Sequence, residues 1–473
     1  MERRVSNTRR EQLRQGRGAG FLAALNAGRS ASFDLLDCVL HDPRWDRQVE
    51  ARDTFYAQLM IATGTNIDAL GRYIAQARHE ADESDYWLPM GVLAEMSRRG
   101  ALAARDTMAE AVKNGSRWRA CLDALEAAGG ADLLGQIVSA ETVQALVARV
   151  AIDDIADAVT VVGAPWERWA ERVPALRFVV RNGAGGIRES RAMSGPVAWT
   201  ASRIRKPEMP GDLTGLSTKS LLARCSTPGA VSELSYELAR RTDSETRRLL
   251  ASTAELGGAE ERHVALRALG KQGSTNFVAA AEEFLRKEST LPSSERREHR
   301  LRQGFLRYLE ELPPAVTLPL ARRWFCESWP LSLAAEHVLA RYATPDDRPM
   351  LEDAGDAALA SSDMYRLCSI VDAIGAAGPD DSLRFLSEVY EQAPYSYARR
   401  RVVSAMSRCS LVGATESYLT EALWDCEPES RELACRAAGQ AMGVPLARIN
   451  EMASDVYESD RVREAARSVV ANK

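Results

Sequence analysis

The stretch that decides the fold runs Asp243-Ser-Glu-Thr-Arg247-Arg-Leu-Leu-Ala-Ser-Thr-Ala-Glu-Leu-Gly257. A short acidic lead-in and an arginine open it, an Ala/Leu-rich segment follows, and a glycine ends it. Related phrases return at Asp363–Gly375, Glu427–Gly439 and Asp460–Ala466. A unit that recurs about every 32 residues cannot bury its apolar face alone, so neighbouring units must stack. The sequence therefore predicts an all-α fold, an α-solenoid of stacked antiparallel helical hairpins.

The length and composition fit such an array. The chain has 473 residues, of which 45% are hydrophobic and 27% are charged. A single compact core does not grow to this size, whereas a repeat array does, because each unit packs only on its neighbours. Apolar runs such as Val159–Val162 are too short to span a bilayer, so no membrane contact is expected. The Arg-rich N-terminus has no apolar segment behind it, which predicts no signal peptide and a cytoplasmic location.

Cysteine and histidine usage argues against a metal site. The eight cysteines form no Cys-x-x-Cys pair, and the five histidines lie far apart in the sequence. The sequence contains no His-Glu-x-x-His motif, no phosphate-binding loop and no Gly-x-Ser-x-Gly elbow. We therefore predict no metal, no cofactor and no catalytic residue. Most cysteines are expected to be buried between helices as small apolar groups.

Three parts of the chain differ in composition. Residues 1–147 are predicted to be an N-terminal array of helical hairpins, which begins with a basic segment (residues 1–20) expected to be a solvated cap helix. Residues 148–216 are rich in glycine, proline and arginine, which predicts an irregular insertion or linker. Residues 217–473 are predicted to be a second, more regular array.

Apolar residues at helical spacing indicate the first hairpins. Phe33, Leu35 and Val39 lie on one predicted apolar stripe, and the turn His41–Arg44 ends that helix because proline cannot continue it. The following stretch Trp45–Arg52 is predicted to open the partner helix. Further helices are predicted at residues 85–100, 103–112 and 116–129.

The irregular part carries the predicted binding residues. Its glycines and prolines exclude long helices, and Arg177–Val180 is predicted to be a short strand. Long irregular segments in a regular scaffold are often functional. The residues that could contact phosphates or an acidic protein surface are Arg177, Arg181, Arg188, Arg191, Trp199, Arg203, Arg205 and Lys206. A solvated loop without a partner is the alternative.

One phrase of the C-terminal part resembles a known repeat. Asp460-Arg-Val-Arg463-Glu-Ala-Ala466 looks like the second-helix signature of HEAT repeats, and Glu260–Gly270 is similar in a looser way. The resemblance covers most of residues 217–473 and, less closely, residues 30–140. The abundance of arginine and alanine is typical of a bacterial source. The resemblance implies an α-solenoid fold and no particular chemistry.

The HEAT resemblance also implies a role for the acid and the arginine of each phrase. In that family the two residues commonly form a ladder between repeats, and three pairs of this chain match the pattern. They are Asp243 with Arg247, Asp363 with Arg366, and Asp460 with Arg463. The stretch Leu331–Tyr342 departs from the pattern because it lacks the pair.

Two tryptophans beside an acid suggest a second function. Trp166 and Trp169 lie about one helical turn apart, with Glu171 nearby. Aromatic rings could stack a nucleobase while the carboxylate stabilises a sugar cation, and this set is similar to the cleft of bacterial DNA glycosylases built from HEAT-like repeats. Tryptophans that fill a hairpin interface are the alternative. The net charge of −5 is a weak basis for nucleic-acid binding.

Blocks of like charge alternate along the C-terminal part. The basic block is Arg286, Lys287, Arg296, Arg297, Arg300, Arg302 and Arg307. An acidic span from Asp346 to Glu391 follows, and Arg399–Arg401 is basic again. Because repeats place equivalent helices on one face, these blocks are expected to form stripes that suit a partner of complementary charge. A solvated surface is the alternative.

These features predict a non-enzymatic scaffold. It would bind a protein partner through the concave face of the solenoid and the basic loop at residues 177–206. The alternative is a HEAT-like nucleic-acid-binding protein, including a DNA glycosylase-type enzyme that uses Trp166, Trp169 and Glu171. The sequence leaves the partner's identity and the oligomeric state open.

Overall fold

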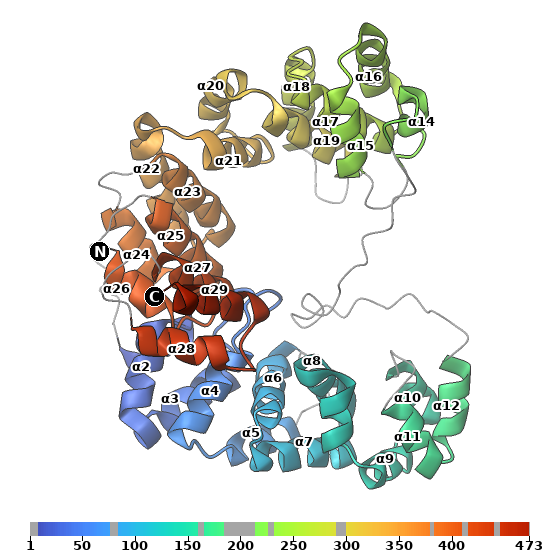
Figure 1. The fold of residues 1–473 in the computed structure, drawn as a ribbon, viewed down its shortest axis with the longest axis vertical. Helices are drawn as coiled ribbons and strands as arrows, with labels where there is room; N and C mark the ends of the chain where they lie inside the picture. Colours follow the sequence, from blue (N-terminus) through green and yellow to red (C-terminus); the bar gives the residue numbers. More distant parts are fainter. Residues whose placement is uncertain are drawn as a thin grey trace. The chain divides into compact units, whose positions relative to one another are not determined.

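The structure, a computed structural model, is all-helical over the residues that it describes (Figure 1). These are residues 8–75, 84–158, 165–183, 213–225, 231–289, 299–378, 383–408, 415–438 and 445–472. No strand occurs among them, which confirms the predicted all-α class. None of their helices is both long and apolar enough to cross a bilayer.

Contacts divide the chain into two units. Unit 1 comprises residues 1–202, 390–403 and 412–473, and unit 2 comprises residues 203–389 and 404–411. In unit 1 the last helices of the chain belong with the first. The predicted boundaries at 147 and 216 stay predictions. Helices α24 (Leu383–Gln392) and α25 (Ser396–Arg408) contribute residues to both units.

Unit 1 begins with helices that pack on their near neighbours in sequence. They are α1 (Arg9–Gln15), α2 (Gly18–Ala27), the short 3-10 helix η1 (Gly28–Ala31), α3 (Ser32–Leu40), α4 (Asp53–Thr63), α5 (Asp68–Ala75), α6 (Ser84–Arg98), α7 (Leu102–Asn114), α8 (Trp118–Ile137), α9 (Ala140–Val147), α10 (Ile152–Ala158), α11 (Trp166–Arg172) and α12 (Leu176–Gly183). Helix α8 is broken at Gly129 and Gly130, and Gly130 has a φ of 66° that favours glycine. The break ends the predicted helix at residues 116–129 where expected.

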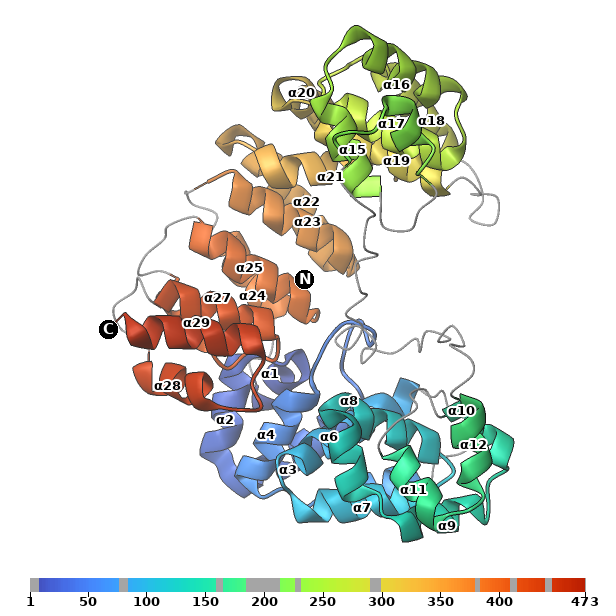
Figure 2. The same ribbon diagram turned by 45° about the vertical axis from the view of Figure 1, so that its right-hand side comes forward.

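The chain returns to unit 1 at its C-terminal end. The helices there are α26 (Glu416–Ala422), α27 (Pro428–Ala438), α28 (Leu446–Ser454) and α29 (Asp460–Ala471). Both ribbon views draw α2 beside these C-terminal helices (Figures 1 and 2). Helix α2 contacts α26, and the backbone N–H of Cys426 donates to the carbonyl of Gly16 at 3.0 Å. The two ends of the chain therefore share one core.

Unit 2 is built from consecutive hairpins. Its helices are α14 (Thr218–Leu222), α15 (Val231–Arg240), α16 (Ser244–Leu256), α17 (Ala259–Lys271), α18 (Val278–Ser289), α19 (His299–Glu311), α20 (Pro314–Trp324), α21 (Leu331–Tyr342), the 3-10 helix η3 (Pro345–Asp347), α22 (Arg348–Ser361) and α23 (Met364–Ala376). Every second helix contacts the next one, so that α15, α17, α19, α21 and α23 form a row, called here the central row. Helix α21 has the predicted bounds and packs on both α20 and α23 although it lacks the acid–arginine pair.

The acid of the repeated phrase begins a helix. The side chain of Asp243 accepts from the N–H of Thr246 at 2.8 Å, and that of Asp363 accepts from the N–H of Arg366 at 3.2 Å. Both are N-caps, which satisfy backbone donors that the first turn leaves unpaired. Asp460 lies one residue later, since Ser459 is the cap of α29. The recurring phrase therefore coincides with the positions where helices begin.

Three local predictions are wrong. Phe33 is 73% exposed, because α3 buries Leu35, Cys38 and Val39 and Phe33 lies on the opposite face. The stretch Trp45–Arg52 is a loop, and helix α4 begins only at Asp53. The predicted strand at residues 177–180 lies within helix α12, which buries Leu176 and Val179 at helical spacing.

Candidate functional site

The predicted basic loop lies almost wholly outside the described residues. Arg188, Arg191, Trp199, Arg203, Arg205 and Lys206 fall there, and Arg181 is placed only as part of the backbone of α12. Arg177 is exposed, and its guanidinium donates to the carbonyls of Ala170 at 3.2 Å and Glu171 at 3.4 Å. These two bonds join α12 to the end of α11. The prediction that this loop binds a partner therefore stays a prediction.

The tryptophans of the second interpretation lie in the core. Trp166 and Trp169 are each 5% exposed, and their rings meet edge to face with centroids 4.9 Å apart. Glu171, two residues further along, is exposed at the surface. Neither ring presents a free face on which a base could stack. This arrangement gives the glycosylase interpretation no support.

Several arginines of the predicted basic block are engaged in ion pairs. Arg286 pairs with Glu327 at 2.8 Å, and Arg302 pairs with Glu288 at 2.9 Å. Arg399, expected to be part of a surface block, has a completely buried side chain. Arg296 and Arg297 lie outside the described residues.

The described part of the basic N-terminal segment, from residue 8 onward, also forms ion pairs. Arg9 and Arg10 bind Asp34 and Asp37, each at 2.6 Å, and both carboxylates belong to α3. Arg17 is 4% exposed and binds both oxygens of Glu421 at 3.0 and 3.1 Å. The expectation of a solvated cap helix is therefore wrong, since α1 and the residues after it are docked by their arginines.

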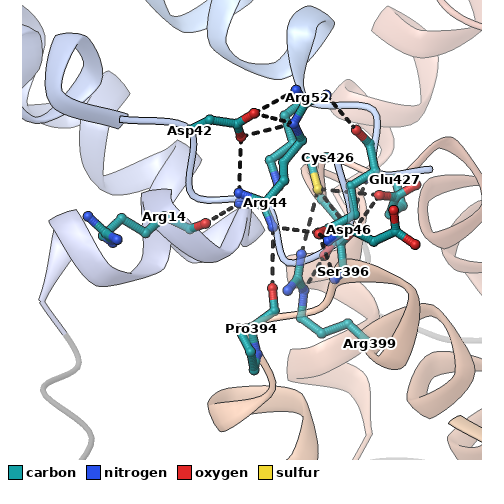
Figure 3. Close-up of polar contacts among 12 residues, drawn as sticks. Arg14, Asp42, Arg44, Asp46, Arg52, Pro394, Ser396, Arg399, Cys426 and Glu427 are labelled. Carbon is teal, nitrogen blue, oxygen red and sulfur yellow. Dashed lines mark hydrogen bonds and ion pairs between the residues drawn. The ribbon is translucent and has the colours of Figure 1, made fainter. Parts of the chain in front are cut away.

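A buried group of charged residues lies where the two ends of unit 1 meet (Figure 3). We call it the closure cluster, and its members are Glu50, Arg52, Ser396, Arg399, Asp425, Cys426 and Glu427. The side chains of Glu50, Arg52, Arg399 and Asp425 are 0% exposed. Charges so deeply buried are stable only when they are paired and hydrogen-bonded.

The loop between α3 and α4 supplies the first half of the cluster. Arg44 binds Asp42 at 2.7 Å and donates to the carbonyl of Glu50 at 3.2 Å, which folds the loop on itself. The N–H of Asp46 donates to Glu50 Oε1 at 2.9 Å. These bonds hold the backbone in a non-helical path, which explains why Trp45–Arg52 does not extend α4. They also aim the Glu50 carboxylate inward.

Arg52 connects this loop to two other segments of the chain. Its guanidinium donates to Glu50 Oε2 at 2.6 Å, to the carbonyl of Pro394 at 3.3 Å, and to the carbonyl of Arg14. Figure 3 shows Arg14 and Pro394 approaching Arg52 from different parts of the chain. A planar guanidinium suits this role because its donors point in several fixed directions.

The C-terminal half of the cluster centres on Ser396, the first residue of α25. Its N–H and its Oγ contact Glu50 Oε2 at 3.0 and 2.8 Å, across 346 residues of sequence. The same Oγ hydrogen-bonds Glu427 Oε1. Arg399, one turn later, pairs with Asp425 at 2.9 Å, and Asp425 accepts from the N–H of Glu427 at 2.9 Å.

The two glutamates have opposite pKa shifts. Burial alone would raise the pKa of Glu50, but the Arg52 guanidinium and the donors from Asp46 and Ser396 outweigh it and lower that pKa. Burial raises the pKa of Glu427 to about 8, and the carboxylates of Glu50 and Asp425 add to the rise. Glu427 is therefore the member of the pair that retains a proton at neutral pH.

The closure cluster contains a thiol, a hydroxyl and carboxylates, yet its geometry does not suit catalysis. Burial raises the pKa of the Cys426 thiol well above its usual value, and Asp425 and Glu427 add to that rise. A thiol is a good nucleophile only as a thiolate, and a nucleophile must be reachable by substrate. The cluster instead binds the loop after α3 to the turns before α25 and α27.

Unit 2 presents a contrasting set of charges along the central row. The pairs are Arg300–Glu260 (3.0 Å), Arg267–Glu311 (3.5 Å) and Lys271–Glu311 (2.8 Å) between α17 and α19, His337–Glu310 (2.6 Å) between α19 and α21, and Arg366–Glu336 (3.3 Å) between α21 and α23. We call them the ladder. Side chains of its basic members are 20–59% exposed, so the ladder lies at the surface of the row.

Within the ladder the carboxylates are more deeply buried than the cations. Glu310 and Glu336 have side chains that are 2% and 6% exposed. Burial raises the pKa of Glu336 to about 7, although Arg366 and His337 act against the rise. Asp243 and Asp363, the acids that the HEAT resemblance assigned to a ladder, cap helices instead, and Arg366 pairs with Glu336 of the preceding hairpin.

Sequence reasoning missed the closure cluster for a definable reason. Its residues come from two stretches, 42–52 and 394–427, which carry no shared pattern. Asp42-Pro43 and Glu427-Pro428 mark turns, and charged residues follow both. These two turns were the sequence features from which the cluster could have been predicted, but nothing in the sequence shows that the two segments contact each other.

Among the described residues, no three or more His, Cys, Asp or Glu side chains come together in a way that could hold a metal ion. Compared with known families and with characterised proteins, the sequence matches neither a family model nor a curated protein. The functional argument therefore rests on the residues themselves.

Proposed function

We propose that this chain is a non-enzymatic scaffold, an α-solenoid of HEAT-like hairpins that holds a protein partner. The proposed binding surface is the ladder of unit 2, and the basic stretch at residues 177–206 is a second, separately tested candidate. The observation that carries the proposal is the ladder itself, because it places partly exposed basic side chains on consecutive helices of the central row. Repeat arrays commonly use such extended surfaces to bind other chains.

Charge is the recognition chemistry that the ladder offers. Glu310 and Glu336 are buried against the helices, whereas the side chains of Arg300 and Arg366 are 59% and 38% exposed, so a partner would meet these two guanidinium groups first. Exposed arginines bind acidic protein segments with bidentate geometry and speed association. We therefore expect a partner with an acidic surface or segment.

The buried thiols support a reducing compartment for this scaffold. Cys38, Cys121 and Cys435 are buried and form no disulfide. Proteins that keep thiols reduced are typical of the cytoplasm. The cytoplasm is accordingly the location that we propose.

A comparison of variants tests the proposal. Immobilised full-length protein is used to capture proteins from the native host, alongside a variant with Arg267, Arg300 and Arg366 changed to alanine. A third protein has residues 181–212 replaced by a Gly/Ser linker. The matched control is Arg436→Ala, which removes an exposed arginine paired within its own helix of unit 1. One acidic protein should be retained by the wild type and the control and lost from the triple variant.

Two outcomes would count against the scaffold. Equal capture by the wild type and the triple variant would show that the ladder is not the binding surface. A steep loss of duplex-DNA affinity as salt rises would indicate phosphate contacts and favour the nucleic-acid alternative.

A further inference from the structure

One serine hydroxyl lies between two buried carboxyl groups of the closure cluster. Ser396 Oγ is 2.8 Å from Glu50 Oε2. The same oxygen is hydrogen-bonded to Glu427 Oε1, and Figure 3 labels both Ser396 and Glu427. A hydroxyl has a single hydrogen, so it can donate to only one of two ionised carboxylates. The second hydrogen bond needs a proton that one of the carboxyl groups itself carries.

The surrounding donors decide which carboxyl group carries that proton. Glu50 Oε2 accepts from Arg52 at 2.6 Å and from the N–H of Ser396 at 3.0 Å, and Oε1 accepts from the N–H of Asp46. These donors stabilise an ionised Glu50. Glu427 is buried beside Glu50 and Asp425, whose negative charges oppose its ionisation. A protonated Glu427 therefore donates to Ser396 Oγ, and Ser396 donates to Glu50.

Other titratable and charged groups face this site from every element packed around it. They are Glu50 and Arg52 of the loop, Tyr56 of α4, Tyr397 and Arg399 of α25, and Asp425, Cys426, Glu429 and Arg431 of the segment that leads into α27. Burial raises the pKa of Tyr56, of Tyr397 and of Cys426, so these three stay neutral in mildly alkaline solution. The arginines stay charged.

We propose that Glu427 takes up one proton when the N-terminal and C-terminal segments of unit 1 close on each other, so that the closure cluster is a pH-sensitive latch. The contacts that close it are those of Glu50 and Arg52 with Ser396 and Pro394. When these contacts separate, water reaches Glu427 and the carboxyl group ionises as an ordinary glutamate does. The inference does not depend on the proposed partner.

The sign of the pH effect follows from the two states of Glu427. Its pKa is about 8 in the closed state and near the ordinary value of 4.5 in the open state. Closure therefore binds a proton between these values. The latch is strongest below pH 4.5, weakens as the pH rises, and stops changing above about pH 8.

Hydrogen exchange on the full-length chain tests the latch. Peptides from residues 42–52 and 394–400 report opening in unit 1. A peptide from residues 259–271 of unit 2 serves as reference, and all proteins carry Glu336→Gln so that the raised pKa of Glu336 does not make this reference depend on pH. In measurements that begin at about pH 6.5, within the interval where the latch weakens, we expect the opening equilibrium of the unit 1 peptides, corrected for the intrinsic pH dependence of exchange, to rise by up to tenfold per pH unit and to level off above about pH 8. A profile that is flat over this window would overturn the proposal.

A matched pair of variants identifies the group. Glu427→Gln keeps the shape, stays neutral and still donates to Ser396 Oγ, so its profile should be flat. Glu429→Gln changes a glutamate two residues away whose side chain is 36% exposed, and its profile should keep the wild-type slope. Equal slopes in Glu427→Gln and the wild type would place the proton elsewhere and refute the latch.

Infrared spectroscopy gives a readout that needs no folded Glu427 variant. A protonated carboxyl group has a carbonyl band that an ionised one lacks. Among the described carboxyl groups, Glu336 and Asp53 also have raised pKa values, of about 7 and about 6. In a background with Glu336→Gln and Asp53→Asn, which removes both, the band should be present at pH 7 and lost above about pH 8. Its absence at pH 7 would overturn the proposal.

Discussion

The closure cluster of unit 1 and the ladder of unit 2 use the same residue types under different burial. Arg399 and Asp425 are both 0% exposed, whereas the ladder pair Arg300–Glu260 has side chains that are 59% and 34% exposed. A surface pair contributes little because water already solvates both charges, while breaking a buried pair leaves a charge with neither water nor partner. The comparison shows that burial decides what an ion pair does for a fold. Four variants can test it.

The largest effect is expected from breaking a buried pair. Arg399→Met fills similar space but leaves Asp425 buried and uncompensated, which should cost about 3–5 kcal/mol of unfolding free energy. Urea unfolding followed by helical circular dichroism measures it. The neighbour Arg400→Met is the control, since the Arg400 side chain is 25% exposed and 3.9 Å from Glu429, and should cost under about 1 kcal/mol. Adding Asp425→Asn to Arg399→Met should restore much of the loss, and similar losses at the two arginines would contradict the comparison.

A steric change where α2 contacts α26 in unit 1 should have the next largest effect on stability. A Cβ added at Gly18 would lie 1.9 Å from the backbone oxygen of Glu421, so α2 and α26 would have to separate. Gly18→Ala should therefore destabilise the protein by roughly 1–3 kcal/mol. In the control Gly71→Ala, the nearest atom is a Thr107 methyl group at 3.2 Å, and alanine favours the helix. Thermal unfolding of both variants measures the difference, and a Gly18→Ala protein as stable as the control would contradict the close approach.

The third prediction concerns Glu336, the buried carboxyl group of the ladder whose pKa is raised. Its titration should make the stability of unit 2 depend on pH. The pKa of Glu336 is about 7 in the folded protein against 4.5 ordinarily, so folding binds a proton and unit 2 loses stability as the pH rises between these values. Glu336→Gln should remove this slope and stabilise unit 2 by about 1–2 kcal/mol at neutral pH. Urea unfolding at several pH values tests it, with the exposed Glu283→Gln as control. A Glu336→Gln protein that keeps the wild-type slope would show that Glu336 is ionised in the fold.

The smallest effect is expected at the most exposed rung of the ladder. Arg300→Ala removes the pair with Glu260 and should cost about 0–1 kcal/mol. That small loss should shrink further in high salt, because screening weakens surface pairs most. A loss of unfolding free energy as large as that of Arg399→Met would mean that exposed ion pairs of the ladder stabilise unit 2 substantially.

Much of the secondary structure was predictable from the sequence. The predicted helices at residues 85–100 and 103–112 match α6 and α7 closely, and Leu331–Tyr342 matches α21. Apolar spacing and N-cap residues such as Asp243 act over a few residues, so they can be read locally. The predictions at Phe33 and at Arg177–Val180 failed because a short apolar run is ambiguous. It can be assigned to more than one face of a helix, or to a strand as well as to a helix.

The closure cluster could not be predicted in the same way. Glu427 and Arg431 belong to a repeated phrase that predicted a helix start, and α27 does begin there. Nothing in that phrase shows that Glu427 would meet Ser396 and lie close to Glu50 from the other end of the chain. Arg399 stands in an Arg-Arg-Arg run that indicates a solvated surface, yet it is fully buried.

By itself the sequence determined the all-helical class, the starts of many helices and the recurrence of their hairpins, because periodicity and capping depend only on nearby residues. The tertiary structure alone decided that the two ends of the chain share one core, which acids are capped, paired or protonated, and which arginines face solvent. The physical reason is that a side chain's charge state and its contribution to stability depend on how far it is removed from water and on which hydrogen-bond and ion-pair partners it gains. Both are supplied by segments hundreds of residues away, as the 346-residue separation of Glu50 and Ser396 shows.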